Sequence, residues 1–204
     1  MHGIAVNAPY LTRDFLQQKR CSAQLMETTY VYDFPDMFRE ACKTRWILHV
    51  KQHSLPKSVI PKEFVRFTEL VLDSHDHLIE IHRVPGQNDT GMIAWKMTLF
   101  VPEYPEGRDV IVIANDITFK IGTFGPEEDK LYMRASEFSR AHKLPRIYLS
   151  GKHVCLVISE IFKSVLDYLP IYNSYLLSNS CLIHVIDTPL YIFHFRLTHD
   201  FNLS

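Results

Sequence analysis

The stretch from Val110 to Ser150 decides the fold, and it reads VIVIANDITFKIGTFGPEEDKLYMRASEFSRAHKLPRIYLS. It opens with a continuous apolar run, which is typical of a strand buried on both faces. A turn with two glycines follows. Residues 126–143 then predict a helix, because Pro126 suits its first position, acidic residues fill its first turn and apolar residues recur at helical spacing. RIYL predicts a second strand, so the stretch forms a βαβ unit of an α/β protein.

The residues before this unit predict further strands and two helices. Residues 67–84 read as a β-hairpin around the turn SHDH, with Ile79 and Ile81 facing inward, and residues 92–101 predict another strand. Closer to the N-terminus the pattern is weaker. There we expect a helix over 11–24, a short strand over 28–34, a helix over 35–43 and a loop over 47–63.

Composition excludes several classes of protein. The formal net charge of −1 does not indicate a nucleic-acid partner, which usually needs a basic face, while scattered Lys and Arg residues leave room for a local patch that could meet a phosphate. The four cysteines lack the spacing of a zinc or redox motif, and the N-terminus has no secretory leader. We therefore expect reduced thiols and a cytoplasmic protein, whose first residues read as the inside of a longer chain.

Residues 151–204 form a tail that is poor in charged residues and in glycine. Within it, residues 168–186 are free of charge and long enough for a membrane helix. Pro170 and several Asn and Ser residues interrupt this stretch, so we predict no membrane span.

Six segments, taken together, resemble one known family. They are KRCSAQLMETTYVYDFPDMFREA (19–41), ELVLDS (69–74), GMIAWKMT (91–98), PEYPEGRDVIVIANDITFKIGTFGPEED (102–129), RASEFSRA (134–141) and PRIYLS (145–150). In this order and at nearly this spacing, they are similar to the start of the carboxyltransferase region of animal and fungal acetyl-CoA carboxylases. The resemblance covers residues 3–150.

The resemblance implies an α/β fold of a particular kind. The family has a crotonase-like β-β-α superhelix built from two related subdomains, and this chain would be an incomplete version of the first, with a divergent C-terminal tail. Residues 1–66 would be an N-terminal helix and strand segment. Residues 67–150 would be the partial crotonase-like subdomain, and residues 151–204 an unrelated tail.

The resemblance also implies a reaction. In the family, a carboxyl group moves from carboxybiotin to acetyl-CoA and gives malonyl-CoA, for fatty acid synthesis. Biotin is carried on a separate carboxyl carrier domain, and ATP acts only through the separate biotin carboxylase domain. Acetyl-CoA, malonyl-CoA, the carrier domain and a second carboxyltransferase subunit are therefore the expected partners, and no metal is expected.

The expected site lies at the glycine turn before the helix. Both the biotin ureido oxygen and the thioester oxygen gain negative charge in this reaction, and backbone N–H groups at a glycine turn stabilise such oxygens. A helix N-terminus adds positive potential. The candidate oxyanion turn consists of Gly122, Thr123, Phe124 and Gly125, and the candidate substrate-binding residues are Gly91, Asn115, Gly122 and Gly125.

The resemblance ends after Ser150. Family members continue this strand into Asn-Ser-Gly-Ala-Arg-Ile-Gly, a turn that borders the CoA site, whereas GKHVCLVISEIF follows here. The second subdomain also has no counterpart. Because the family's active site lies between subdomains of two protomers, we expect no carboxyltransferase activity from this chain alone.

Several residues also have a purely structural interpretation. Gly122 and Gly125 can simply shape a tight turn, and Asn115 and Asp116 can cap it. Lys19 and Arg20 either meet a CoA phosphate or lie on a solvated helix face.

Histidines and cysteines point to no further chemistry. His75, His77 and His82 surround a hairpin without a carboxylate–histidine motif, so we predict no metal site there. Cys42 and Cys155 are expected to be buried or idle thiols.

Three functional hypotheses follow. The chain is part of a carboxyltransferase, or a non-catalytic form that associates with and regulates a full-length carboxylase. A third hypothesis is a chain that does not fold, because the strand at 147–149 would be an unpaired edge next to an apolar tail.

Overall fold

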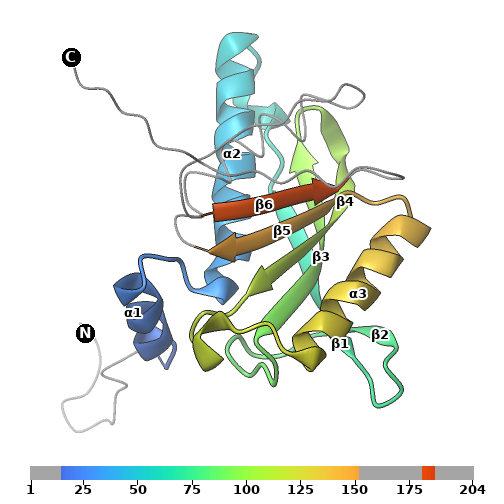
Figure 1. The fold of residues 1–204 in the computed structure, drawn as a ribbon. Coiled ribbons are helices and arrows are strands. Elements are labelled where there is room, and N and C mark those ends of the chain that lie inside the picture. Colours follow the sequence, from blue (N-terminus) through green and yellow to red (C-terminus); the bar gives the residue numbers. More distant parts are fainter. Residues whose placement is uncertain (1–14, 152–180, 187–204) are drawn as a thin grey trace, which may run out of the picture.

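The computed structural model describes residues 15–151 and 181–186, and its centre is a six-stranded sheet in the order β2-β1-β3-β4-β5-β6 (Figure 1). The strands are β1 (Val65–Leu72), β2 (Leu78–Ile81), β3 (Met92–Val101), β4 (Tyr104–Asn115), β5 (Arg146–Gly151) and β6 (Cys181–Ile186). The helices are α1 (Gln17–Leu25), α2 (Phe34–Gln52) and α3 (Pro126–Ala141), with short 3₁₀ turns η1 (Val31–Asp33), η2 (Lys57–Val59) and η3 (Lys120–Gly122).

The predicted βαβ unit is present. β4 pairs with β5 in parallel, and α3 makes the crossover between them, whereas the other neighbouring strands are antiparallel. The protein is therefore mixed α/β. The apolar run that predicted a doubly buried strand is confirmed, because residues 110–114 of β4 are all fully buried.

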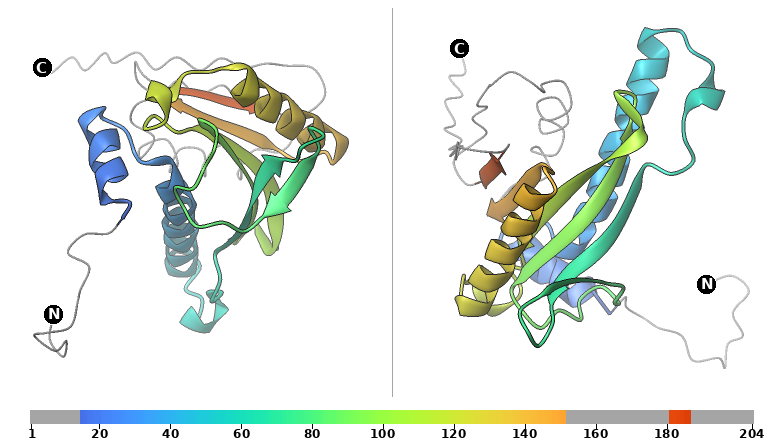
Figure 2. Two further views of the ribbon diagram at one scale, coloured as in Figure 1. Left: turned by 90° about the horizontal axis from the view of Figure 1, so that it is seen from below. Right: turned by 90° about the vertical axis from the view of Figure 1, so that its right-hand side faces the viewer.

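Helices cover both faces of the sheet, and Figure 2 shows α2 and α3 on opposite sides of it. On one face, Phe38 and Cys42 of α2 pack with Trp95 and Val112. On the other face, Leu131 and Ala135 of α3 pack with alternate residues of the same strands. This confirms the apolar stripe of α3 and the buried thiol of Cys42. Cys155 lies outside the described residues.

Two predictions for the N-terminal segment are wrong. Residues 47–63 are not all loop, because α2 continues to Gln52. Its buried stripe extends through Trp46 and Val50, so packing against the sheet carries the helix past the expected end. The expected strand over 28–34 is instead a loop and the turn η1, since Tyr30, Val31 and Phe34 are buried together rather than alternately.

The hairpin β1–β2 is confirmed, but its inward-facing residues were assigned incorrectly. Ile79 is 42% exposed, because β2 is an edge strand that only β1 covers. The predicted helix over 11–24 begins at Gln17 in the described residues, and residues 11–14 lie outside them.

The strand at 147–149 is not an unpaired edge. β6, from the tail, pairs with it antiparallel, and Ile147 lies opposite Val185. The backbone hydrogen-bonding groups on this edge of β5, which we expected to favour aggregation, are therefore paired with β6. None of the helices in the described ranges is long and apolar enough to cross a bilayer.

Candidate functional site

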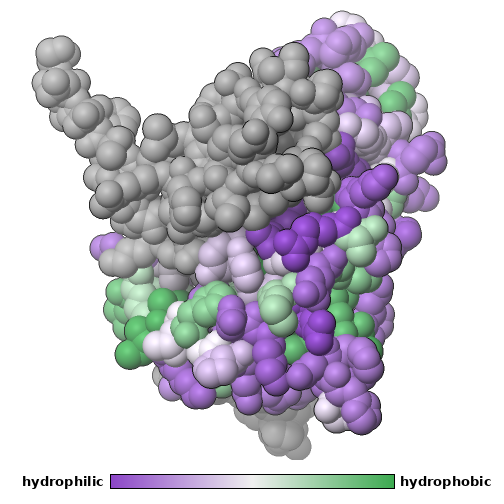
Figure 3. All heavy atoms as spheres, turned by 45° about the vertical axis from the view of Figure 1, so that its right-hand side comes forward, coloured by the Kyte–Doolittle hydropathy of each residue, from purple (hydrophilic) through white to green (hydrophobic). Residues whose placement is uncertain are grey.

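The candidate turn Gly122–Gly125 follows β4, and the backbone that leads into it is strained. Lys120, Ile121 and Gly122 have φ values of 44°, 59° and 67°, so three successive residues are left-handed. Glycine adopts this conformation freely, but a β-branched residue such as Ile121 does so only at a cost of about 1–2 kcal/mol. Ile121 is 75% exposed and Phe124 48% exposed. In Figure 3, apolar residues gather at the lower left, where this turn and the start of α3 lie.

Three of the four backbone N–H groups of the turn Gly122–Gly125 already have an acceptor in a neighbouring residue. Gly122 N–H donates to the Phe119 carbonyl at 2.9 Å, and Thr123 N–H donates to the Lys120 carbonyl at 3.2 Å. Gly125 N–H donates to Glu128 Oε2 at 3.0 Å. Phe124 N–H has no acceptor among the described residues, so it is the one amide of this turn that is free to bind an oxyanion.

Asn115 connects the turn to β5. Its Nδ2 donates to the Gly122 carbonyl at 3.2 Å, and its Oδ1 accepts the hydroxyl of Tyr148 at 2.9 Å. Tyr148 stacks edge-on against Tyr132 of α3, and Tyr132 against Phe124. Sequence reasoning missed both tyrosines, although the alternation within RIYL is the signal that puts Tyr148 on the face covered by α3.

Glu128 joins the two remaining candidate glycines. Its Oε1 accepts Gly91 N–H at 2.8 Å, and its Oε2 accepts Gly125 N–H. The carboxylate is 7% exposed. Burial by itself raises the pKa of Glu128, but the amide donors outweigh burial and hold that pKa below its ordinary value. There is little room for a side chain at position 91, because a Cβ added to Gly91 would lie 3.3 Å from Glu128 Oε1.

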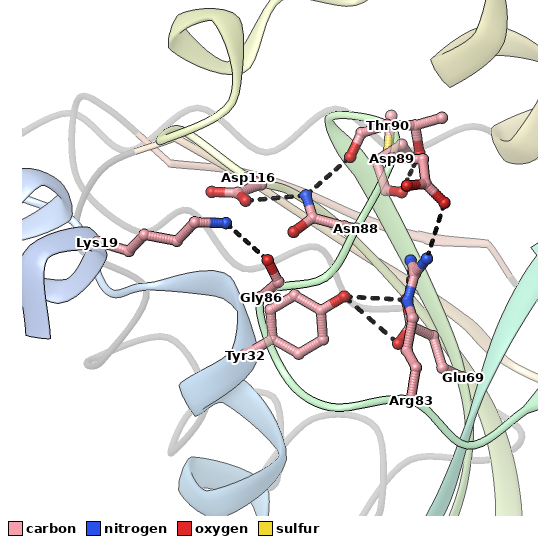
Figure 4. Close-up of polar contacts among 10 residues, drawn as sticks. Lys19, Tyr32, Glu69, Arg83, Gly86, Asn88, Asp89, Thr90 and Asp116 are labelled. Carbon is pink, nitrogen blue, oxygen red and sulfur yellow. Dashed lines mark hydrogen bonds and ion pairs between the residues drawn. The ribbon is translucent and has the colours of Figure 1, made fainter. Parts of the chain in front are cut away.

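Asp116, expected to cap the turn, does so from a fully buried position. Its Oδ1 accepts both the backbone N–H and the hydroxyl of Thr118, at 2.9 and 2.6 Å. Its Oδ2 accepts Asn88 Nδ2 at 3.0 Å, and Asn88 also donates to the Thr90 carbonyl (Figure 4). With all these donors, Asp116 is a structural carboxylate that holds the loop before β3 against the end of β4.

Figure 4 also shows a second polar cluster, made of Tyr32, Glu69 and Arg83. Arg83 donates to Glu69 Oε1 at 2.6 Å, and Tyr32 donates to the same oxygen at 3.1 Å. Burial raises the pKa of Tyr32, and the neighbouring Glu69 carboxylate raises it further. Tyr32 therefore stays a neutral donor, and the cluster ties η1 to β1.

Lys19 and Arg20 are engaged within the protein. Lys19 Nζ donates to the Gly86 carbonyl at 3.0 Å, and Arg20 forms a bidentate pair with Asp33. The structural interpretation therefore accounts for both side chains. Residues 15–149 contain no group of three metal-binding side chains, and His75 and His77 flank the hairpin turn, where Asp73 accepts their backbone N–H groups.

The structure thus brings the candidate residues together at the carboxyl end of β4. Asn115 binds Gly122, while Glu128 binds Gly91 and Gly125. Among the described residues no nucleophile and general base are paired at this turn. What it offers is a shaped backbone, one free amide and a helix N-terminus, which suit binding and polarisation of an oxygen atom.

Comparison with known proteins identifies this element. A family model described as the carboxyl transferase domain matches residues 102–152, which include β4, the candidate turn, α3 and β5. An acetyl-CoA carboxylase of Schizosaccharomyces pombe is 47% identical over 151 residues. Those of Saccharomyces cerevisiae and Dictyostelium discoideum are 45% and 43% identical over 151 and 171 residues. The chain contains part of a carboxyltransferase region of the eukaryotic acetyl-CoA carboxylase family.

The part of these relatives that this chain matches is only a small share of their length. The matches to the Schizosaccharomyces and Saccharomyces proteins cover 74% of this chain but 6% of each relative, and the Dictyostelium match covers 73% and 8%. Another relative from Saccharomyces cerevisiae, 44% identical, is named as a mitochondrial acetyl-CoA carboxylase.

Proposed function

We propose that this chain supplies the front part of a carboxyltransferase active site, in which a carboxyl group passes from carboxybiotin to acetyl-CoA and malonyl-CoA is formed. The observation that carries this proposal is the identity of 47% with an acetyl-CoA carboxylase over 74% of the chain. The family match at 102–152 is centred on the candidate turn. The candidate turn therefore lies inside the segment that matches the family, which supports a role for it in the reaction.

The proposal extends to the fold and its division. We infer a crotonase-like β-β-α superhelix of which this chain holds an incomplete first subdomain, with boundaries near residues 66 and 150. The mixed sheet and its βαβ unit are compatible with that arrangement.

Within this site, the turn Gly122–Gly125 would stabilise negative charge on an oxygen of the reacting groups. Phe124 N–H is the available donor. The backbone dipole of α3 adds positive potential at its N-terminus, and the acidic side chains of its first turn oppose part of that potential. Asn115 holds the Gly122 carbonyl, and Glu128 holds Gly91 and Gly125, so these side chains keep the turn in shape for the substrate.

One free amide is an incomplete donor set for the reaction. Removing one donor from an oxyanion hole typically costs about 100-fold to 1,000-fold in kcat. We therefore infer that this chain is inactive alone and that further donors come from sequence outside the described residues.

The proposed partners follow from the reaction. They are acetyl-CoA or malonyl-CoA, a biotin carboxyl carrier domain and a second carboxyltransferase subunit, while ATP acts through a separate biotin carboxylase domain. We propose a cytoplasmic location, although one relative is named as mitochondrial.

A chimera tests the proposal. Residues 15–149 of this chain would replace the matching segment of the Schizosaccharomyces pombe carboxylase, and malonyl-CoA formation would be measured. We expect activity within about tenfold of the parent, a difference of about 1.4 kcal/mol in transition-state stabilisation. Gly122→Ala in the chimera should reduce it strongly, because an added Cβ would lie 3.1 Å from Ile117 Cδ1 at a φ of 67°.

Biotin carboxylation driven by ATP serves as the control for folding of the remaining enzyme. A chimera that carboxylates biotin but forms no malonyl-CoA would refute the proposal. The regulatory alternative has no supporting contact among the described residues, and the relatives are named as carboxylases, which favours the enzyme.

A further inference from the structure

Arg146 is a buried arginine at the start of β5. It is 7% exposed and faces α3. Its Nη1 donates to Ser136 Oγ, and its guanidinium lies 4.8 Å from the centroid of the Tyr132 ring. Its Nε is buried and has no acceptor among the described residues. Among the described residues, one hydrogen bond and one ring contact therefore surround this full positive charge.

No carboxylate in residues 15–149 forms an ion pair with Arg146. Arg83 provides the contrast within the same chain, because its side chain is 16% exposed and is paired with Glu69 at 2.6 Å. Burial lowers the pKa of Arg146, and the like charge of Arg140 lowers it further. Arginine is rarely buried without a counter-charge, since the desolvation cost of an ion amounts to several kcal/mol.

The α3 side of this position is also suited to an anion. Tyr132, Ser136 and Arg140 recur every four residues along α3, so they form one stripe of the helix, next to the start of β5. The Ser136 hydroxyl donates to the Tyr132 carbonyl and accepts from Arg146, so it holds the guanidinium in place, and the exposed Arg140 contributes a second positive charge. A guanidinium presents a planar set of N–H donors that matches the oxygens of phosphate and carboxylate groups.

We propose that Arg146, held in place by Ser136, forms together with Arg140 an oxyanion-binding site that takes a phosphate or carboxylate group. The site lies on β5 and the later turns of α3, apart from the turn Gly122–Gly125. It therefore stands on its own observations and does not depend on the proposed carboxyltransferase function.

Thermal unfolding of the full 204-residue chain in different sodium salts tests the site. Phosphate and acetate would each be compared with chloride at equal ionic strength. A ligand that binds only the folded state raises Tm, and we expect a saturable increase of about 3 °C at concentrations well above Kd. An increase with phosphate but not acetate identifies a phosphate group, and an equal increase with acetate identifies a carboxylate.

Arg146→Met should abolish this increase. In chloride its Tm should be no lower than that of the parent chain, because replacing an unpaired buried charge by an apolar side chain removes a desolvation cost. Arg83→Met is the matched control. It should lower Tm by leaving the buried Glu69 carboxylate without its positively charged partner, and it should keep the response to the anion.

A second measurement does not depend on any variant. The Nε–Hε resonance of Arg146 in the NMR spectrum of the parent chain should shift saturably with the effective anion and not with chloride. The proposal is overturned if neither phosphate nor acetate shifts Tm or this resonance beyond the effect of chloride. It is equally overturned if Arg146→Met retains the full response.

Discussion

The carboxylate of Glu128 accepts the backbone N–H of Gly91 at 2.8 Å, although the two residues are 37 positions apart in the chain. The first turn of α3 is thereby fastened to the residue that precedes β3. The other oxygen of Glu128 accepts Gly125 N–H at 3.0 Å, so one side chain holds both ends of the candidate site. The site is therefore held together by a helix residue whose two carboxylate oxygens each accept a backbone amide.

Glu128→Gln should destabilise the protein by about 2 kcal/mol, because hydrogen bonds to a charged group are lost and the amide nitrogen of Gln cannot accept one. Chemical denaturation at neutral pH measures this change in the free energy of unfolding. Glu127→Gln, at an exposed position of the same turn, is the control and should change stability by less than about 0.5 kcal/mol.

The same carboxylate predicts a dependence of stability on pH. The folded-state pKa of Glu128 lies below its ordinary value, so its contribution is complete above that ordinary value and is lost as the pH falls through the folded-state pKa. The free energy of unfolding should therefore decrease in acid less steeply in Glu128→Gln than in the parent chain. Equal slopes in the two proteins would contradict the assignment.

Tyr148→Phe should cost about 1 kcal/mol, since Asn115 Oδ1 loses a donor at 2.9 Å. Amide hydrogen exchange should also accelerate at Gly122, whose carbonyl Asn115 holds. Tyr104→Phe removes a hydroxyl without a hydrogen-bond partner in residues 15–149, and its exchange rates should match the parent. Unchanged exchange at Gly122 in Tyr148→Phe would show that Asn115 is held by other means.

Ile121→Gly should stabilise the protein by about 1 kcal/mol, because glycine adopts a φ of 59° without the cost that a β-branched residue carries. Little burial is lost, as Ile121 is 75% exposed. Val59→Gly, at an exposed position outside the left-handed region, should instead lower stability. A fall in Tm for Ile121→Gly would mean that the turn is not strained.

Phe38→Ala should destabilise the protein by about 3–5 kcal/mol by opening a cavity between α2 and the sheet. Phe15→Ala removes the same ring from a position that is 67% exposed and should have little effect. Urea denaturation of both variants measures the difference. A similar small effect in both would show that α2 is not part of the cooperative core.

The sequence by itself determined the elements whose signal is local. The apolar run of β4, Pro126 and the acidic first turn of α3 predicted the βαβ unit, because burial period and helix capping are properties of neighbouring residues. The family resemblance likewise depends on contiguous segments. Local signals gave the wrong result in two places. At η1, the burial of Tyr30 outweighed the aromatic alternation that predicted a strand, and at the end of α2 the packing of Trp46 and Val50 outweighed the basic composition that predicted a loop.

Only the tertiary structure decided how the candidate site is held. The partners of Gly91, Asn115 and Gly122 come from residues distant in the chain or on other elements. Within the described residues, no carboxylate forms an ion pair with Arg146, and its Nε has no acceptor. Hydrogen bonds and ion pairs of this kind depend on distances between elements, which residue type and spacing do not specify. The sequence therefore predicted where the chain turns, and the packing of α3 on β4 and β5 determined which groups of that turn remain free to act.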